Sequence, residues 1–405
     1  MKTILPFCKA FVLLIASYFV FAVLSCLLPD QSINKNIKES AEKLVNEGLY
    51  PKAIISLSQC QMDNFTDALI MNQICSIDRS RPVRSAMRVY RSSEQGRDWD
   101  QTGLLFRKMN GEDLDSHHYA RYWHGNTFLF RFFFLVMDFN TIRWTLFVVS
   151  GMLMVMLICA FYQKAGLVKT LALSSGFLVT CGFVTQFSMQ FFPVLALTLI
   201  GCLLVIKRIE SKNLGMLLFV IGSLTCYFDL LTAPLLTLGM PLAVLLSLNE
   251  DNPFKLKDNF INLAKLTLLW GLGFALTFFT KWVLATLILG QNILADAYNT
   301  GLYRMEAEEF TRWDALSRNF KMIQLWMIVV AVVLFIIFNV LKHKKFNYKK
   351  AVLFVLIGLA PYVWYLILSN HSYLHWWFTY RIQAITIACL LLMLAEPFTQ
   401  KYKIQ

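Results

Sequence analysis

Apolar residues along this chain are gathered into long runs, and most polar residues lie between the runs. A run of ~20 apolar residues crosses the hydrocarbon core of a bilayer as one helix, because backbone groups in lipid need partners within the segment. The runs predict an all-α polytopic membrane protein with about ten transmembrane helices. The predicted spans cover residues 4–28, 140–162, 167–186, 187–206, 213–228, 231–248, 262–289, 322–341, 351–368 and 382–398.

One polar segment, residues 29–126, is much longer than the others. Within it, residues 37–49 follow the period of an amphipathic helix, and a second helix is predicted over 66–75. The apolar run at 128–139 is too short to span and predicts an interfacial or re-entrant helix. We therefore expect four parts: a signal-anchor helix at 1–28, a helical loop domain at 29–126, a polytopic domain at 127–398 and a tail at 399–405.

The first apolar run also resembles a secretory signal peptide. Lys2 and Lys9 precede most of the apolar stretch, and V-L-S-C at 23–26 is similar to a lipoprotein cleavage box. Apolar Leu27 and Leu28 follow that box, and the rest of the chain is multispanning. An uncleaved signal-anchor is the interpretation that these features favour.

The composition indicates a membrane protein, and the positions of the charged residues predict its orientation in the membrane. Charged residues make up 16% of the chain, against about 25% in soluble domains. Lysine-rich clusters at 207–212, 342–350 and 401–403 lie between or after the spans, and the positive-inside rule places them in the cytoplasm. Both termini are then cytoplasmic in the plasma membrane, and residues 29–126, 290–320 and 370–381 are extracytoplasmic.

The net charge of +13 does not indicate a nucleic-acid partner. The chain has no basic–aromatic RNA signature and no zinc-finger spacing, so membrane lipids are the expected surroundings. Two of the nine cysteines, Cys60 and Cys75, lie well inside the loop domain, where a disulfide between them is one alternative. The other cysteines lie in or beside apolar runs and are expected to fill space there. No C-x-x-C pattern occurs, so no metal site is predicted.

Two carboxylates in the loop domain have a spacing that suits base catalysis. Asp63 and Asp67, in D-N-F-T-D, are four residues apart and would share one helical face. One can accept a proton while the other tunes it. The alternative is a structural role, with Asp63 as a helix N-cap and Asp67 facing solvent.

Two clusters of histidine, aromatic and arginine residues precede membrane segments. The first, S-H-H-Y-A-R-Y-W-H-G at 116–125, supplies groups that can bind phosphate or stack on a sugar: His118, Arg121, Tyr122 and His124. The second, at 370–381, contributes His371, His375 and Arg381. Their similarity predicts two walls of one site, and an interfacial aromatic belt is the alternative.

Further ionisable residues lie in apolar surroundings, where they are costly and are functional candidates. Asp229 is predicted at the outer end of its span, and Arg131, Arg143 and Lys281 lie among apolar residues. Arg131 or Lys281 would be able to neutralise a lipid phosphate. Alternatively, these side chains extend to the interface. Arg304 is predicted on the same outer side.

The plan of one leading span, a long first outer loop with acids and helices, and then many spans resembles the GT-C superfamily of membrane glycosyltransferases. D-N-F-T-D at 63–67 and Y-A-R-Y-W-H-G at 119–125 carry that resemblance within the loop. It implies transfer of a sugar from a polyprenyl-phosphate carrier to a glycan, lipid or protein acceptor on the extracytoplasmic face, without cofactor or metal. Nucleotide and serine-hydrolase motifs are absent from the sequence, in agreement.

The resemblance also implies roles for particular residues. Asp63 or Asp67 would deprotonate the acceptor hydroxyl. Many relatives place this acid directly after the first helix, where this chain has Asp30, so the base stays open among the three. The leaving lipid phosphate would be stabilised by one or more cations: Arg121, Arg381 or Lys281.

Other functions fit the same pattern less well. A polysaccharide polymerase or ligase usually has its largest outer loop late in the chain, whereas here it comes first. A transporter of lipid-linked sugars would have charges at mid-bilayer depth rather than at one face, and no inverted repeat is visible. An acyl- or phosphotransferase is a further alternative.

Overall fold

The computed structural model describes residues 4–207, 213–251, 253–306, 309–323, 333, 337 and 347–396. Several predicted features therefore lie wholly or mostly outside the described residues: the lysine clusters at 207–212, 342–350 and 401–403, most of the span at 322–341, and the tail at 399–405. The described chain is helical, with a single two-stranded sheet. In it, β1 (Tyr90–Ser93) pairs antiparallel with β2 (Asp115–His118).

Five of the described helical segments are long and apolar enough to cross a membrane. They are α1 (Leu5–Cys26), α7 (Phe139–Val179), α12 (Leu256–Leu289), α16 (Tyr348–Ile367) and the run Trp376–Ala395 that ends in α19 (Ala384–Ala395). Three shorter apolar helices accompany them: α9 (Phe192–Lys207), α10 (Leu214–Phe228) and α11 (Leu236–Ser247). The all-α membrane class is confirmed, and the number of ten spans stays a prediction.

Helix α7 covers two of the predicted spans and reverses direction between them. Gly166 has φ 79° and ψ 175°, a backbone conformation that glycine adopts without steric cost. Asn140, near its start, accepts a hydrogen bond from Lys43, and Cys181, just past its end, is bonded to Cys60. Both ends therefore meet the polar domain, so α7 consists of two antiparallel arms.

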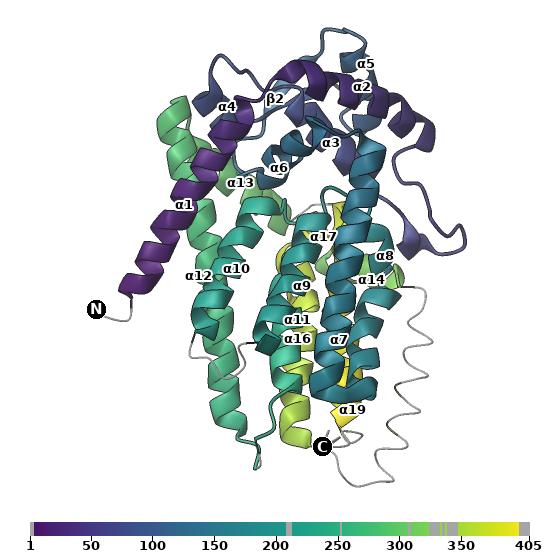
Figure 1. Cartoon of the computed structure of the whole chain (residues 1–405), viewed down its shortest axis with the longest axis vertical. Helices are drawn as coiled ribbons and strands as arrows, with labels where there is room; N and C mark the ends of the chain where they lie inside the picture. The colour runs from purple at the N-terminus through teal and green to yellow at the C-terminus, as the bar shows by residue number, and fades with distance from the viewer. Residues whose placement is uncertain are drawn as a thin grey trace.

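Residues 29–134 form a polar domain at one end of the long helices (Figure 1). It contains α2 (Asp30–Glu47), a 3-10 turn η1 (Ser58–Cys60), α3 (Asn64–Ile74), α4 (Pro82–Arg88), the sheet, α5 (Gln101–Met109) and α6 (Gly125–Phe134). The predicted helix at 66–75 corresponds to α3, and that at 37–49 to the second half of α2. Helix α6 stands where an interfacial or re-entrant helix was predicted. Its apolar face is buried in the protein, through Phe128, Phe130 and Phe134.

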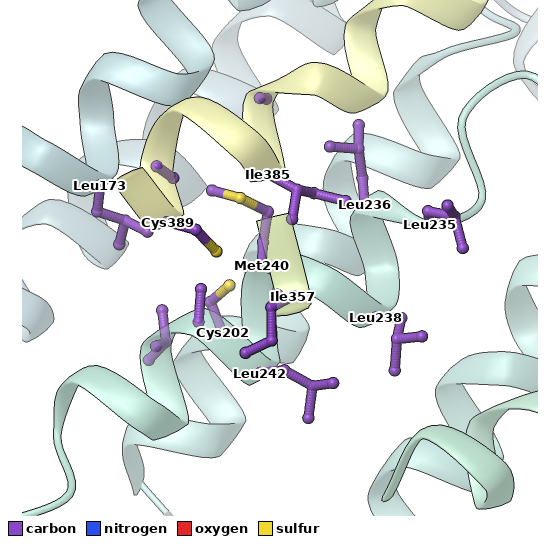
Figure 2. Packing of buried hydrophobic residues seen from close by; sticks show 14 of the residues in the cluster. Leu173, Cys202, Leu235, Leu236, Leu238, Met240, Leu242, Ile357, Ile385 and Cys389 are labelled. Carbon is purple, nitrogen blue, oxygen red and sulfur yellow. The ribbon is translucent and has the colours of Figure 1, made fainter. Parts of the chain in front are cut away.

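The remaining helices pack through small residues and apolar side chains. A Cβ atom added to Gly222 of α10 would lie 2.1 Å from the Trp270 carbonyl oxygen of α12, and one added to Gly273 would lie 2.1 Å from that of Phe219. Close approach of this kind is how helices associate in lipid. Around α11 and α19 the core is continuous, as Figure 2 shows for Met240, Ile385 and their neighbours.

Short elements close the same end of the bundle as the polar domain. Helix α8 (Gly182–Thr185) follows α7, while α13 (Ile293–Met305) and α14 (Arg312–Lys321) follow α12. Helices α17 (Ser369–Leu374) and α18 (Trp376–Thr379) lead through a 3-10 turn η2 (Tyr380–Gln383) into α19. Asn319 of α14 donates to the Ser372 carbonyl oxygen over 2.8 Å, which ties α14 to α17.

The buried guanidinium of Arg131 joins α1 to the polar domain. Its Nε donates to the Ser25 carbonyl oxygen over 2.9 Å, and Nη1 donates to that of Ile74 over 2.8 Å. Nη2 donates to the Leu28 carbonyl oxygen over 3.1 Å and forms an ion pair with Asp30. Arg131 thus caps the ends of α1 and α3 and holds the start of α2, instead of extending to a lipid phosphate.

The disulfide of the polar domain is formed with a different partner from the one considered in the sequence. Cys60 is bonded to Cys181, after α7, and Cys75 is free. Cys75 lies at the end of α3, where its Sγ contacts the Met109 sulfur at 3.9 Å. The pairing of Cys60 with Cys75 is therefore wrong, and so is the interpretation of Cys181 as an apolar filler.

We predict that Arg131→Met destabilises the protein strongly. Three carbonyl oxygens and one carboxylate would lose their donor, and each carbonyl oxygen left without a partner inside the protein costs about 1–3 kcal/mol. Thermal unfolding in detergent should show a large drop in midpoint. Asp30→Asn should cost less, because Asp30 is partly exposed. Equal stability of Arg131→Met and the wild type would contradict this role.

We also predict that Cys60→Ser and Cys181→Ser each abolish one disulfide, whereas Cys75→Ser leaves it intact. Thiol-specific labelling of the unfolded chain, with and without reductant, gives the number of bonded cysteines. A disulfide lost in the Cys75→Ser variant would contradict the observed pairing.

Candidate anion-binding site

A cavity of about 270 Å³ lies where the polar domain meets α13, α17 and α18. Its wall combines residues that are far apart in sequence, from β1 to α18. The lining residues are Phe65, Thr66, Leu69, Arg91, Tyr119, Arg121, Gln190, Leu230, Thr300, Tyr303, Arg304, Asn370, His371, Leu374, His375, Trp377 and Phe378. The cavity thus joins the two histidine–aromatic clusters of the sequence through Arg121, His371 and His375.

Three arginines line this cavity, and no described lining residue is acidic. Arg91 pairs with Asp98 at 3.2 Å, and Arg121 lies 3.5 Å from Asp296. Arg304 forms no ion pair among the described residues and lies over the Tyr122 ring, with its guanidinium carbon 5.3 Å from the centroid. The cavity therefore has a positive electrostatic character that favours an anion.

Arg121 is held in place by two tryptophans. The Trp282 indole of α12 donates to the Arg121 carbonyl oxygen over 2.9 Å, and buried Trp123 donates to that of Thr277 over 2.8 Å. The His124 Nε2 donates to the Tyr119 carbonyl oxygen over 2.7 Å, which closes the intervening turn. Because Tyr122, Trp123 and His124 are buried in the protein, the interfacial-belt interpretation is wrong for them.

The two histidines of the second cluster form the opposite wall. The His371 Nε2 donates to the Leu231 carbonyl oxygen over 3.0 Å, and the two imidazole centroids are 4.8 Å apart. Burial, followed by the charge of Arg304, lowers the pKa of His371 well below its usual range and that of His375 to about 4. Both rings are therefore neutral near pH 7.

Several buried polar atoms in this wall have no hydrogen-bond partner among the described residues. They are Arg121 Nε, Asn370 Oδ1, His371 Nδ1 and His375 Nδ1. Unpaired buried groups are costly, and each one requires an explanation. All four residues line one cavity, which makes its wall a candidate site for a polar ligand.

The three candidate base carboxylates lie outside the lining of the cavity. Asp30 pairs with Arg131. Asp63 is the N-cap of α3, where Oδ1 accepts from the Thr66 N–H over 3.0 Å and Oδ2 accepts from the Thr66 hydroxyl over 2.7 Å. Asp67 accepts from the Met189 N–H over 3.0 Å and so caps the turn before α9. The N-cap expected for Asp63 is present, but Asp67 is buried rather than exposed to solvent.

The remaining candidates are distributed around the site. His118 is exposed in β2, and Tyr122 packs against the lining residue Tyr119, with ring centroids 5.3 Å apart. Lys281 donates to the Met87 carbonyl oxygen at the end of α4 over 3.0 Å. Arg381 donates to that of Gln61 over 2.8 Å, and Asp229 accepts from the Thr232 N–H over 2.9 Å. None of these five lines the cavity.

Arg143 is likewise bonded within the protein. Its Nη1 lies 2.8 Å from Glu47 Oε2, and Nη2 donates to the Asn64 side chain. This arginine joins α7 to α2 and α3. Together with Lys281, it shows that cations in apolar stretches of this sequence anchor the polar domain to the helices.

Three lining residues were not predicted as site residues from the sequence: Arg91, Gln190 and Asn370. Arg91 belongs to a strand that was not predicted, and Gln190 lies inside a predicted span. Asn370 begins the second cluster, and Arg304 had been placed only on the same side. The sequence signal for these residues is a polar side chain next to an apolar run. That signal does not indicate which polar side chains lie together in the folded protein.

No match to this chain is found among protein-family models, curated proteins or solved structures. Among the described residues, no group of three or more His, Cys, Asp or Glu side chains could hold a metal ion. The resemblance to the GT-C superfamily therefore stays an expectation, and the chemistry of the site rests on its geometry.

We predict that Asp67→Asn changes how stability depends on pH. Burial is the main cause that raises the pKa of Asp67, to about 8, whereas an unfolded Asp has a pKa of about 3.9. The protonated carboxyl contributes its full stabilisation below the pKa of the unfolded state. This stabilisation declines as the pH rises and is lost once the pH has passed the pKa of the folded state. Wild-type protein should therefore lose stability relative to the variant between pH 4 and pH 8.

Thermal unfolding of both proteins at pH 5 and pH 9 measures this difference. Asp98→Asn, which changes a partly exposed carboxylate, is the matched control. Parallel changes in the unfolding midpoints of the wild type and Asp67→Asn would contradict the prediction.

Proposed function

We propose that this protein is a membrane glycosyltransferase that moves a sugar from a polyprenyl-phosphate carrier to an acceptor on the extracytoplasmic face. The observation that carries the proposal is the cavity lined by Arg91, Arg121 and Arg304 at the junction between the polar domain and the apolar helices. A lipid-linked phosphate is presented at this boundary, since its prenyl chain stays in the bilayer and its headgroup reaches the polar region.

The arginines suit a phosphate that leaves during the reaction. Guanidinium groups bind phosphate oxygens through charge-assisted hydrogen bonds, and fixed cations stabilise negative charge that develops on a leaving group. Arg304 is the best placed of the three, because it has no ion pair among the described residues. Arg91 and Arg121 keep their carboxylate partners at the edge of the site.

The rest of the wall suits a sugar. Tyr119 and Trp377 offer aromatic faces, and Asn370 and the two histidines offer acceptors for hydroxyl groups. The volume of about 270 Å³ is close to the lower end of ligand pockets, about 300 Å³. A sugar-phosphate headgroup is thus a better fit than an extended glycan.

Two features support the proposed orientation. The disulfide between Cys60 and Cys181 favours a polar domain in an oxidising compartment. In Figure 1 the start of α1 and the end of α19 both lie away from the polar domain.

We predict that Arg304→Gln lowers transfer from radiolabelled polyprenyl-phosphate sugars by about 10- to 100-fold in kcat/KM. The loss corresponds to one charged hydrogen bond of about 1.5–3 kcal/mol. Arg312→Gln is the matched control, because Arg312 is an exposed arginine of the same region that pairs with Glu306 outside the cavity.

The assay uses purified full-length protein in lipid and a panel of donor sugars and acceptors. Transfer by the wild type and by Arg312→Gln, with a loss in Arg304→Gln, would support the proposal. Full activity of Arg304→Gln, or no transfer from any donor by the wild type, would count against it.

A further inference from the structure

We propose that His371 takes the proton from the acceptor hydroxyl, through its Nδ1 atom, while the sugar leaves its phosphate. This inference rests on the proposed function and replaces the three carboxylates as the base. It is carried by the orientation of one imidazole, by its place in the cavity wall, and by the bonds that the carboxylates already make.

One hydrogen bond fixes which nitrogen of His371 can accept a proton. The Leu231 carbonyl oxygen lies 3.0 Å from Nε2 and can only accept, so Nε2 carries the hydrogen. In the neutral ring, Nδ1 then has a free lone pair. This Nδ1 is buried without a partner among the described residues, and the side chain lines the cavity.

The carbonyl that orients His371 belongs to a constrained turn. Leu231 has φ 67°, a left-handed conformation that is unfavourable for a residue with a branched side chain. Asp229 holds this turn, since its Oδ1 accepts from the Thr232 N–H over 2.9 Å. Local strain of this kind persists where surrounding contacts enforce it, often at functional sites. Asp229 is thus a positioning residue that acts on His371 through the backbone.

The carboxylates are less suited to this step. Both oxygens of Asp63 accept hydrogen bonds from Thr66, Asp67 caps the turn before α9, and Asp30 pairs with Arg131. None of them lines the cavity. His375 does line it, but no hydrogen bond of its ring fixes a tautomer among the described residues.

Donor binding would make His371 a stronger base. Burial, the positive charge of Arg304 on α13 and neighbouring His375 all lower the pKa of His371. A phosphate bound to Arg304 cancels that charge and adds a negative one nearby, which raises the pKa. The ring therefore becomes ready to accept a proton when the donor is in place.

The step is balanced as a single displacement. The acceptor oxygen forms a bond to the anomeric carbon as the bond from that carbon to the phosphate oxygen breaks, and the electron pair leaves with the phosphate. The acceptor proton passes to His371 Nδ1. The resulting imidazolium keeps its Nε2 bond to Leu231 and later releases the Nδ1 proton to solvent.

The test compares His371→Gln with the wild type. The glutamine amide can still donate to the Leu231 carbonyl oxygen but cannot accept the proton. We expect kcat to fall about 100- to 10,000-fold, the usual contribution of a general base, with the KM for the donor within about threefold because binding is retained. His117→Gln, an exposed histidine in β2, is the control and should keep wild-type kinetics.

Azide provides a readout that a structural role would not give. It is an anionic nucleophile without a proton to lose, so it should form glycosyl azide at similar rates in the wild type and in His371→Gln. Loss of azide transfer together with normal transfer would mean that the variant has lost the site itself, and this would overturn the inference.

Two further outcomes separate this inference from the proposed function. If the wild type transfers sugar and His371→Gln has an unchanged kcat, His371 is not the base, and the glycosyltransferase proposal stands. The same conclusion holds if Asp63→Asn or Asp67→Asn, instead of His371→Gln, loses transfer to the hydroxyl acceptor but keeps transfer to azide. No transfer from any donor by the wild type would overturn both.

Discussion

The arrangement of the polar domain depends on one buried guanidinium. Arg131 donates to the carbonyl oxygens at the ends of α1 and α3 and to the carboxylate at the start of α2. Helix ends leave carbonyl groups without partners, and here a single planar side chain satisfies two of them at once. Helix α3 also carries Thr66 and Leu69, which line the cavity. Arg131 therefore helps to position the cavity wall although it does not line the cavity itself.

Cations in apolar stretches of this chain have a common structural use. Arg143 joins α7 to the polar domain, and Lys281 of α12 binds the end of α4. Each places its charge on carbonyl or carboxylate oxygens instead of leaving it unpaired, which is required where water is excluded. At the junction three arginines line one cavity, and Arg304 is the one without an ion pair among the described residues.

The local periodicity of the sequence predicted the helices better than the tertiary contacts between them. The helix at 66–75 and the apolar runs follow from spacing along the chain, and D-N-F-T-D correctly included an N-cap. The cavity depends on segments that are distant in the sequence, such as those that carry Arg91 and His371, and no local pattern encodes how they meet. The same limit explains the disulfide. Cys75 is near Cys60 in sequence, whereas Cys181 approaches it only because α7 reverses at Gly166.

That disulfide has a consequence for the order of biogenesis. Its two cysteines are 121 residues apart, and both arms of α7 are synthesised between them. In the proposed orientation, Cys60 reaches the oxidising compartment long before Cys181 has been translated. Cys75 follows Cys60 closely in the sequence, so it enters that compartment soon after Cys60 and is available as a wrong partner. The thiol of Cys60 must therefore stay reduced, or be released from a premature bond, until the helical hairpin has been inserted. In that orientation, oxidation links the polar domain to α7 only after both arms of the helical hairpin have been inserted.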